Sequence, residues 1–360
     1  MIKENHIKLF IPGPTHVREE ILKEMAKPVI GHRTKEISEL FSQIVPKLQK
    51  LLFTKNKIGI FTCSSTGLME AAIRNCVKKR VLIPVCGAFS ERWAKIAKAN
   101  GKEVETIEVE WGKAILPEMI EEKLKEKEFD ALALVHNETS TGVENPLEEI
   151  SQVLKNHPQI CFLVDAVSSL GGVKIEVDKL GIDVILAGVQ KCFALPPGIA
   201  ICSISEKAIE KAKNVENRGF YFDFLHYLER FEKKRQTPET PAVSILFALN
   251  KQLDYILEKE GLENRFLRHQ KMAKIVQDWA REKFELFAQK EYLSKTLTCI
   301  KNNRNIDINE LREQLRKRGK EISDGYGKLK GKCFRIAHMG DLQVDDIKEL
   351  LNDIEEILKL

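Results

Sequence analysis

The chain lacks the cysteine and histidine patterns that mark metal sites and disulfide frameworks. Its eight cysteines form no Cys-x-x-Cys pair, and its eight histidines include no His-Glu-x-x-His motif. These absences argue against a metal site, and unpaired cysteines predict a reducing compartment, the cytoplasm. No run approaches about 18 uninterrupted apolar residues, and the N-terminus lacks the apolar core of a signal peptide, so we expect no membrane span and no membrane partner.

Charge of neither sign dominates the sequence. There are 58 lysines and arginines against 53 aspartates and glutamates, and the basic clusters are short and scattered. A nucleic-acid-binding protein usually concentrates basic residues on one face. We therefore expect solvated helix surfaces and no nucleic-acid partner.

What the sequence does contain is an alternation of short apolar runs with amphipathic stretches, from about residue 37 to 260. The apolar runs, which we interpret as buried strands, lie at 58–61, 81–85, 131–135, 162–164, 184–186 and 199–202. Helical patterns such as 89–100 and 146–155 separate most of them. This alternation predicts an α/β fold with a mostly parallel sheet covered by helices on both faces.

After about residue 240 the pattern changes. Long helical stretches alternate there with two strand-like pieces, at 297–300 and 333–337. This predicts a smaller α+β C-terminal domain. We accordingly divide the 360 residues into an N-terminal arm (1–15), a large domain (16–245) and a small domain (246–360).

Two of the apolar runs each deliver one charged residue to their carboxyl end. Lys191 follows the run at 184–186 and precedes Pro196-Pro197-Gly198, and Asp165 follows the run at 162–164. A lone buried charge is costly unless it is paired, and ligands in such sheets bind beyond the carboxyl ends of the strands. Pyridoxal 5'-phosphate (PLP) needs a lysine for its aldehyde and an acid for its pyridine nitrogen. The alternative is a lysine that reaches solvent and an aspartate that caps a helix.

Further motifs surround this pair along nearly the whole chain. They are Pro12-Gly13-Pro14-Thr15, Gly31-His32-Arg33-Thr34, Ser64-Ser65-Thr66-Gly67, Glu138-Thr139-Ser140-Thr141-Gly142-Val143, the run from Asp165 to Gly172, Gln190-Lys191, the run from Thr237 to Pro241, and Phe334-Arg335-Ile336. In this order they resemble the class V aminotransferases, of PLP fold type I. The alanine–glyoxylate and serine–pyruvate transaminases are the most similar by motif. The resemblance implies PLP as the cofactor and a homodimer with composite active sites.

The resemblance also implies individual roles. Lys191 would attach the cofactor and move the substrate's Cα proton, Asp165 would keep the pyridine nitrogen protonated, and Arg335 would hold the substrate α-carboxylate. Cofactor binding is implied for Ser64, Ser65, Thr66, Phe89, Thr139 and Gln190, and, toward the neighbouring subunit's phosphate, for Gln236, Thr237 and Thr240. Simpler explanations are a helix N-cap for the Ser-Ser-Thr triplet, a core position for Phe89 and a surface position for Arg335.

His32 and Arg33 are candidates for substrate binding. The segment Gly31-His32-Arg33-Thr34-Lys35 resembles a loop of phosphoserine transaminases in which the cationic pair meets the substrate's phosphate. The alternative is that Arg33 merely precedes the amphipathic helix at 35–52.

The sequence therefore predicts a transaminase that works by a ping-pong reaction through Lys191. It would move an amino group between a small amino acid, of the alanine or serine type, and a 2-oxo acid such as glyoxylate or pyruvate. A phosphoserine or aspartate transaminase that uses 2-oxoglutarate is the alternative. A cysteine desulfurase would want a histidine where Gln190 stands, and a mobile cysteine further from Arg335 than Cys333. A non-catalytic protein would not need both Lys191 and Asp165.

Overall fold

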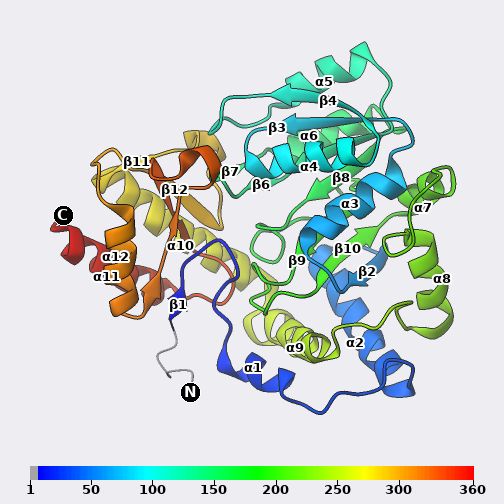
Figure 1. Ribbon diagram of the computed structural model, residues 1–360, viewed down its shortest axis with the longest axis horizontal. Helices are drawn as coiled ribbons and strands as arrows, with labels where there is room; N and C mark the ends of the chain where they lie inside the picture. The colour runs from blue at the N-terminus through cyan, green and yellow to red at the C-terminus, as the bar shows by residue number, and fades with distance from the viewer. Residues whose placement is uncertain (1–6) are drawn as a thin grey trace.

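The computed structural model describes residues 7–360. It has a large α/β part and a smaller α+β part, which lie side by side in Figure 1. A seven-stranded sheet forms the centre of the large part, in the order β2(Lys57–Phe61), β10(Ala200–Ile204), β9(Val184–Gly188), β8(Cys161–Asp165), β5(Ala131–Val135), β3(Arg80–Val85), β4(Glu103–Glu108). Strand β10 is antiparallel to both of its neighbours, and the other pairs are parallel. The predicted mostly parallel sheet is confirmed.

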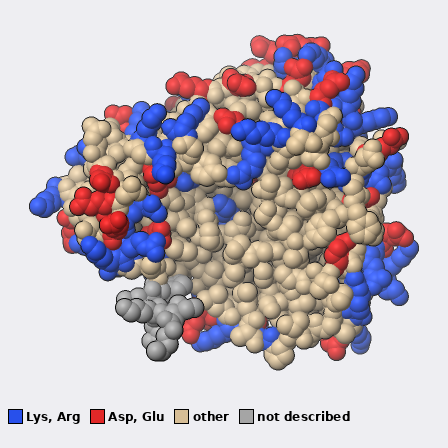
Figure 2. All heavy atoms as spheres, viewed as in Figure 1, with Lys and Arg blue, Asp and Glu red and all other residues tan. Residues whose placement is uncertain are grey.

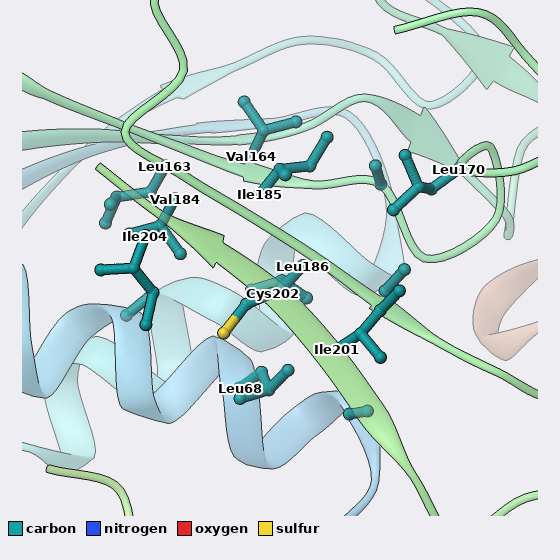
Figure 3. Packing of buried hydrophobic residues seen from close by; sticks show 14 of the residues in the cluster. Leu68, Leu163, Val164, Leu170, Val184, Ile185, Leu186, Ile201, Cys202 and Ile204 are labelled. Atoms are coloured by element: carbon teal, nitrogen blue, oxygen red, sulfur yellow. The ribbon is translucent and has the colours of Figure 1, made fainter. Parts of the chain in front are cut away.

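Helices cover the sheet because each has one apolar face. They are α2(Lys35–Leu52), α3(Ser65–Cys76), α4(Ala88–Ala99), α5(Pro117–Glu126), α6(Leu147–Lys155), α7(Glu206–Lys213), α8(Phe224–Lys234) and α9(Val243–Asp254), with α1(Glu19–Met25) beside α9. Figure 3 shows part of this core: Leu186 of β9 and Cys202 of β10 lie close to Leu68 of α3. The strands are buried on both faces, as a parallel sheet between two helix layers requires. A short hairpin, β6(Asn137–Glu138) with β7(Val143–Glu144), follows β5.

The small part is a four-stranded antiparallel sheet packed on helices. Its strand order is β11(Glu285–Leu286), β12(Leu297–Lys301), β15(Cys333–Ala337), β14(Ser323–Asp324), and its helices are α10(Leu262–Lys283), α11(Ile308–Lys317) and α12(Val344–Leu358). Short helical turns lie at η1(Tyr255–Glu260), η2(Lys290–Tyr292) and η3(Gly327–Leu329). Strand β1(Lys8–Leu9) pairs with β13(Lys320–Glu321), so residues 8–9 lie against the small part.

The structure has two main hydrophobic cores, one in the large part and one in the small part. Helix α9 packs on α1 and α2, and the large core extends to Ile256 because α9 buries its apolar face there. The small core is formed by apolar residues between Met272 and Ile354, together with Phe10 from the expected N-terminal arm. The boundary expected at 245/246 therefore falls inside α9. Residues 1–6 of the expected arm lie outside the described part.

Among residues 7–360, no helix combines the length and the apolar character needed to cross a membrane. The same residues contain no group of three or more His, Cys, Asp or Glu side chains that could hold a metal ion.

Candidate active site

A cavity of ≈ 220 Å³ lies where the parallel strands end, between the first turns of α3 and α4 and the loops that follow β5, β8 and β9. Eight of the residues predicted from the sequence line it: Ser64, Ser65, Thr66, Phe89, Thr139, Asp165, Gln190 and Lys191. Figure 2 shows a hollow near the middle of one face of the molecule, with basic side-chain atoms at its bottom. The fold thus brings together segments from residue 64 to residue 191, as the strand-end rule for α/β sheets predicts.

Lys191 and Asp165 contribute opposite charges to this cavity without neutralising each other. Neither forms an ion pair with another residue between 7 and 360. Burial raises the pKa of the Asp165 carboxyl to about 7, and the N–H of Val167, which donates to Oδ1 at 2.8 Å, opposes that rise. Burial, reinforced by the nearby Arg335 guanidinium, lowers the pKa of the Lys191 amine to about 8. An amine with such a pKa is available as a nucleophile or base near neutral pH.

The N-terminal segment passes directly over Lys191. The Nζ atom of Lys191 donates to the carbonyl of Pro12, and Oγ1 of Thr15 donates to the Lys191 carbonyl at 2.9 Å. Gly13 has φ +91°, and a Cβ built there would lie 2.5 Å from Cδ of Lys191. Glycine is therefore needed where this segment crosses the lysine.

Two buried polar atoms that line the cavity have no hydrogen-bond partner among the described residues. They are Oγ of Ser65 and Oδ1 of Asn137. Ser65 begins helix α3, and Ser64 occupies the N-cap position without making a side-chain capping bond. The Ser64 hydroxyl is thus not used as a helix cap, contrary to the simpler explanation. A helix N-terminus with unused hydroxyls suits an anionic ligand group, especially a phosphate.

Phe89 is held at the cavity wall by a buried carboxylate. Glu138 accepts hydrogen bonds from the backbone N–H groups of Phe89, Ser90 and Ser140 at 3.0–3.2 Å. Phe89 itself is partly exposed, so it is not a core phenylalanine. On the other side, the hydroxyls of Thr139 and Ser168 are hydrogen-bonded at 2.5 Å.

Arg335 reaches the site from strand β15 of the small part. It is 7 % exposed, so it is not a surface arginine. Its Nε donates to the Asp324 carbonyl at 3.0 Å and its Nη1 to the Thr139 carbonyl at 3.3 Å. An arginine has five N–H donors, so the others can serve a carboxylate.

The remaining predicted residues form a separate cluster that does not line the cavity of their own chain. Arg33 donates from Nη1 to the Thr237 carbonyl at 2.5 Å and from Nη2 to the Pro238 carbonyl. His32 Nε2 lies 3.5 Å from Oγ1 of Thr240. Nε2 of Gln236 donates to the Thr34 carbonyl at 3.3 Å. The loops at 31–34 and 236–240 hold one another, so Arg33 has a structural role within the chain.

Several site residues were not predicted from the sequence. They are Met69, Arg92, Val135, Asn137, Val167 and Ser168, which line the cavity, and Tyr326, which contacts Phe89. Arg92 follows Phe89 by three residues on one helix face, a spacing that could have indicated it. Tyr326 belongs to a loop of the small part, and no local pattern places that loop at the cavity.

A lysine after β9 and an aspartate at the end of β8 line one cavity, on a large α/β part with a small α+β part, as the class V aminotransferase motifs predicted. Residues 9–328 match the family model described as Aminotransferase class-V, and the chain belongs to this family. The predicted family and fold class are thereby confirmed.

Relatives agree over nearly the full length. An uncharacterised aminotransferase of Methanocaldococcus jannaschii is 43% identical over 357 residues, which span 98% of this chain and 92% of that protein. The serine–glyoxylate aminotransferase of Arabidopsis thaliana is 31% identical over 364 residues, 98% of this chain and 90% of that protein. The crystal structure of ureidoglycine–glyoxylate aminotransferase from Bacillus subtilis matches with a TM-score of 0.91 at 30% identity, over 98% of this chain and 93% of that one.

Proposed function

We propose that this aminotransferase uses PLP to move an amino group from a small amino acid, of the alanine or serine type, to a 2-oxo acid such as glyoxylate. The observation that carries the proposal is the pair of unneutralised charges, Lys191 and Asp165, in a cavity that also contains two unpartnered polar atoms. Such an arrangement is costly in the folded protein unless a ligand completes it.

The residues of the cavity fit PLP group by group. Ser64, Ser65 and Thr66 at the start of α3, with Gln190, would hold the dianionic phosphate. Asp165 would pair with the pyridine nitrogen, and Phe89 would stack on the ring. Thr139, with Ser168 beside it, would lie near the ring hydroxyl. When bound, the cofactor supplies the electron sink that makes the substrate's Cα proton acidic.

The chain's own residues then bind the substrate and move one proton. Arg335 orients the α-carboxylate through its remaining N–H donors, which fixes the direction of the Cα–H bond. The Nζ atom of Lys191, with its pKa lowered to about 8, accepts and returns that proton. Asp165 is stabilised in its charged form once a cationic ring nitrogen lies beside it.

The surroundings of the cavity favour a small, neutral donor. Arg33 donates two hydrogen bonds to carbonyls of its own chain, and Arg92 donates one to Tyr326 Oη at 3.0 Å. Arg33 does not line the cavity of its own chain, so it is not placed to meet a second acid group of a substrate bound there. Glyoxylate is the shared acceptor in the names of the Arabidopsis and Bacillus relatives. An aspartate or phosphoserine donor remains the alternative.

We further propose a homodimer in which Gln236, Thr237 and Thr240 complete the partner's phosphate site. These residues do not line the cavity of their own chain. Val29 and Phe220 are exposed by 70% and 71%, unusually high for large apolar side chains. On the face of the molecule that Figure 2 draws, a broad area has few charged side chains. It lies in the region where Figure 1 draws α9 and β9. Exposed apolar side chains such as Val29 and Phe220 favour association between copies. The free cysteines fit the cytoplasm.

The test is a panel of donor–acceptor pairs assayed on pure protein, alongside its absorption spectrum and its size. The proposal expects bound PLP, transfer from alanine or serine to glyoxylate, and a dimer. Protein that binds no PLP would overturn the cofactor assignment, and a preference for phosphoserine or aspartate would select the alternative. A fully active monomer would exclude composite sites.

A further inference from the structure

Tyr326 lies in the turn-containing loop that connects β14 to β15, and a residue next to this loop also binds Arg335. In this turn the N–H of Gly325 donates to the Cys333 carbonyl at 2.7 Å. A Cβ at Gly325 would lie 2.0 Å from the Leu329 carbonyl oxygen, so only glycine fits. The carbonyl of Asp324, one residue earlier, accepts from Nε of Arg335 at 3.0 Å. The turn therefore fixes Tyr326 and Arg335 relative to one another.

The side chain of Tyr326 contacts three residues around the cavity. Its ring stacks on Phe89 with a centroid distance of 5.3 Å and an interplanar angle of 27°. Its hydroxyl accepts a hydrogen bond from Nη2 of Arg92 at 3.0 Å. The Cζ atom of Arg335 lies 5.6 Å from the centroid of the same ring. Phe89 and Arg92 belong to α4 of the large part, whereas Arg335 and Tyr326 belong to the small part.

These contacts place Tyr326 between the residue proposed to stack on the cofactor and the residue proposed to hold the substrate carboxylate. An aromatic face attracts a guanidinium and restricts the directions in which its N–H groups point. A ring stacked on Phe89 likewise restricts the tilt of the Phe89 ring. Movement of the small part would shift Tyr326 and Arg335 together relative to Phe89.

We propose that Tyr326 is a positioning residue for carboxylate substrates. It orients the Arg335 guanidinium toward the α-carboxylate of the amino acid or the 2-oxo acid, and it stabilises the Phe89 ring by stacking on it. The bond from Arg92 to its hydroxyl holds the turn against α4. This role rests on the proposed transaminase function.

The test compares Tyr326→Ala with Tyr326→Phe, and uses Lys328→Ala as a control in the same turn. The Lys328 ammonium lies over Trp111, 3.9 Å from its centroid, and does not line the cavity. For Tyr326→Ala we expect KM for both donor and acceptor to rise about tenfold with little change in kcat, because orientation of the carboxylate is lost. The dissociation constant of PLP from the protein, followed by absorbance, should rise by about threefold. Tyr326→Phe keeps the ring and should restore most of both quantities.

Thermal unfolding of each variant separates this role from a purely structural one. A structural residue would lower the melting temperature of Tyr326→Ala without the selective rise in KM, and that result would overturn the proposal. Equal KM values in Tyr326→Ala and Lys328→Ala would overturn it as well. The proposed function fails by a different result, namely wild-type protein that shows neither PLP binding nor transamination.

Discussion

Arg265 and Lys191 are both cations held inside the protein, and their surroundings differ in one respect. Arg265 is fully buried at the first turn of α10, where Nη1 lies 2.6 Å from Glu260 and 3.1 Å from Asp341. Asp341 in turn accepts from Nε of Arg18 at 2.6 Å. Lys191 borders a cavity and has no ion-pair partner among residues 7–360. The first cation is neutralised by the chain itself, and the second is left for a ligand.

The two regions are also connected. Nε of Arg265 donates to the Gly171 carbonyl at 2.8 Å, and its Nη2 donates to the Cys192 carbonyl at 2.5 Å. Cys192 directly follows Lys191, and Gly171 belongs to the segment that follows Asp165. Arg265, which is itself held by Glu260 and Asp341, therefore fixes the backbone of the loop after Asp165 and of the loop that contains Lys191. The two unpaired charges lower the stability of the folded protein. A ligand that binds them in the folded state offsets that loss.

The largest effect should come from removing the unpaired cation. Lys191→Ala should abolish turnover, because no other lysine lines the described cavity. PLP should still bind through its phosphate, but the absorption band of lysine-linked cofactor should disappear. The control is Lys179→Ala, because the Lys179 side chain is 68% exposed and its ammonium pairs with Glu176. A Lys191→Ala protein that retained the band would show that another lysine attaches the cofactor.

Removing the unpaired anion should have the next largest effect. Asp165→Asn should lower kcat by about a thousandfold or more, since each ~1.4 kcal/mol added to the barrier slows the reaction tenfold. Without cofactor the same substitution should stabilise the protein. The folded pKa of about 7 lies above the ordinary 3.8, so the charged form costs stability progressively as pH rises from about 4 to 7, and fully above that.

Denaturant unfolding of cofactor-free protein checks this sign. The advantage of Asp165→Asn over wild type should be larger at pH 8 than at pH 5, on the order of a few kcal/mol at most. Asp345→Asn serves as control because its carboxylate is 94% exposed. An advantage independent of pH would show that Asp165 is not strained by burial of its charge.

Removing the paired cation, Arg265, should destabilise the protein, whereas Asp165→Asn should stabilise it. Arg265→Met leaves Glu260 and Asp341 with fewer partners, so the free energy of unfolding should fall by about 3–5 kcal/mol. Affinity for PLP should also weaken, because the carbonyls of Gly171 and Cys192 lose their donor. Arg316→Met, at a surface ion pair with Glu321, should cost less than about 1 kcal/mol. Comparable losses in the two variants would contradict the distinction between paired and exposed charge.

The sequence predicted the centre of the large part well because buried strands are continuous apolar runs. The runs at 131–135 and 184–186 lie within strands of the structure. Strand β4 (Glu103–Glu108) was missed because it lies at the sheet edge and is half exposed, with no apolar run. A helical pattern from 241 to 260 does not show which core its apolar face joins, and in the structure residues such as Leu249 and Ile256 join the large core.

For the site, the sequence was informative where a residue directly follows a strand or begins a helix. Lys191, Asp165 and Ser65 are of this kind, and all three line the cavity. Tyr326 and Asn137 were missed because their contacts are set by distant parts of the chain, including Arg92 for Tyr326 and Thr296 for Asn137. The alternation at Cys333–Ala337 suggested a cleft for Arg335, but not the carbonyls that hold it.

The smallest effect should come from Arg33, a cation satisfied by neither a carboxylate nor a ligand. Its two guanidinium nitrogens donate to carbonyls of Thr237 and Pro238, and the side chain lies at the surface. Arg33→Ala should cost about 1 kcal/mol of stability, because exposed hydrogen bonds of this kind contribute little. It should lower kcat/KM by a similar factor for phosphoserine, aspartate, alanine and serine, since loosening the 236–240 loop disturbs every donor equally. A loss confined to phosphoserine and aspartate would instead show that Arg33 recognises a second acid group in a composite site, and would make an anionic donor the better assignment.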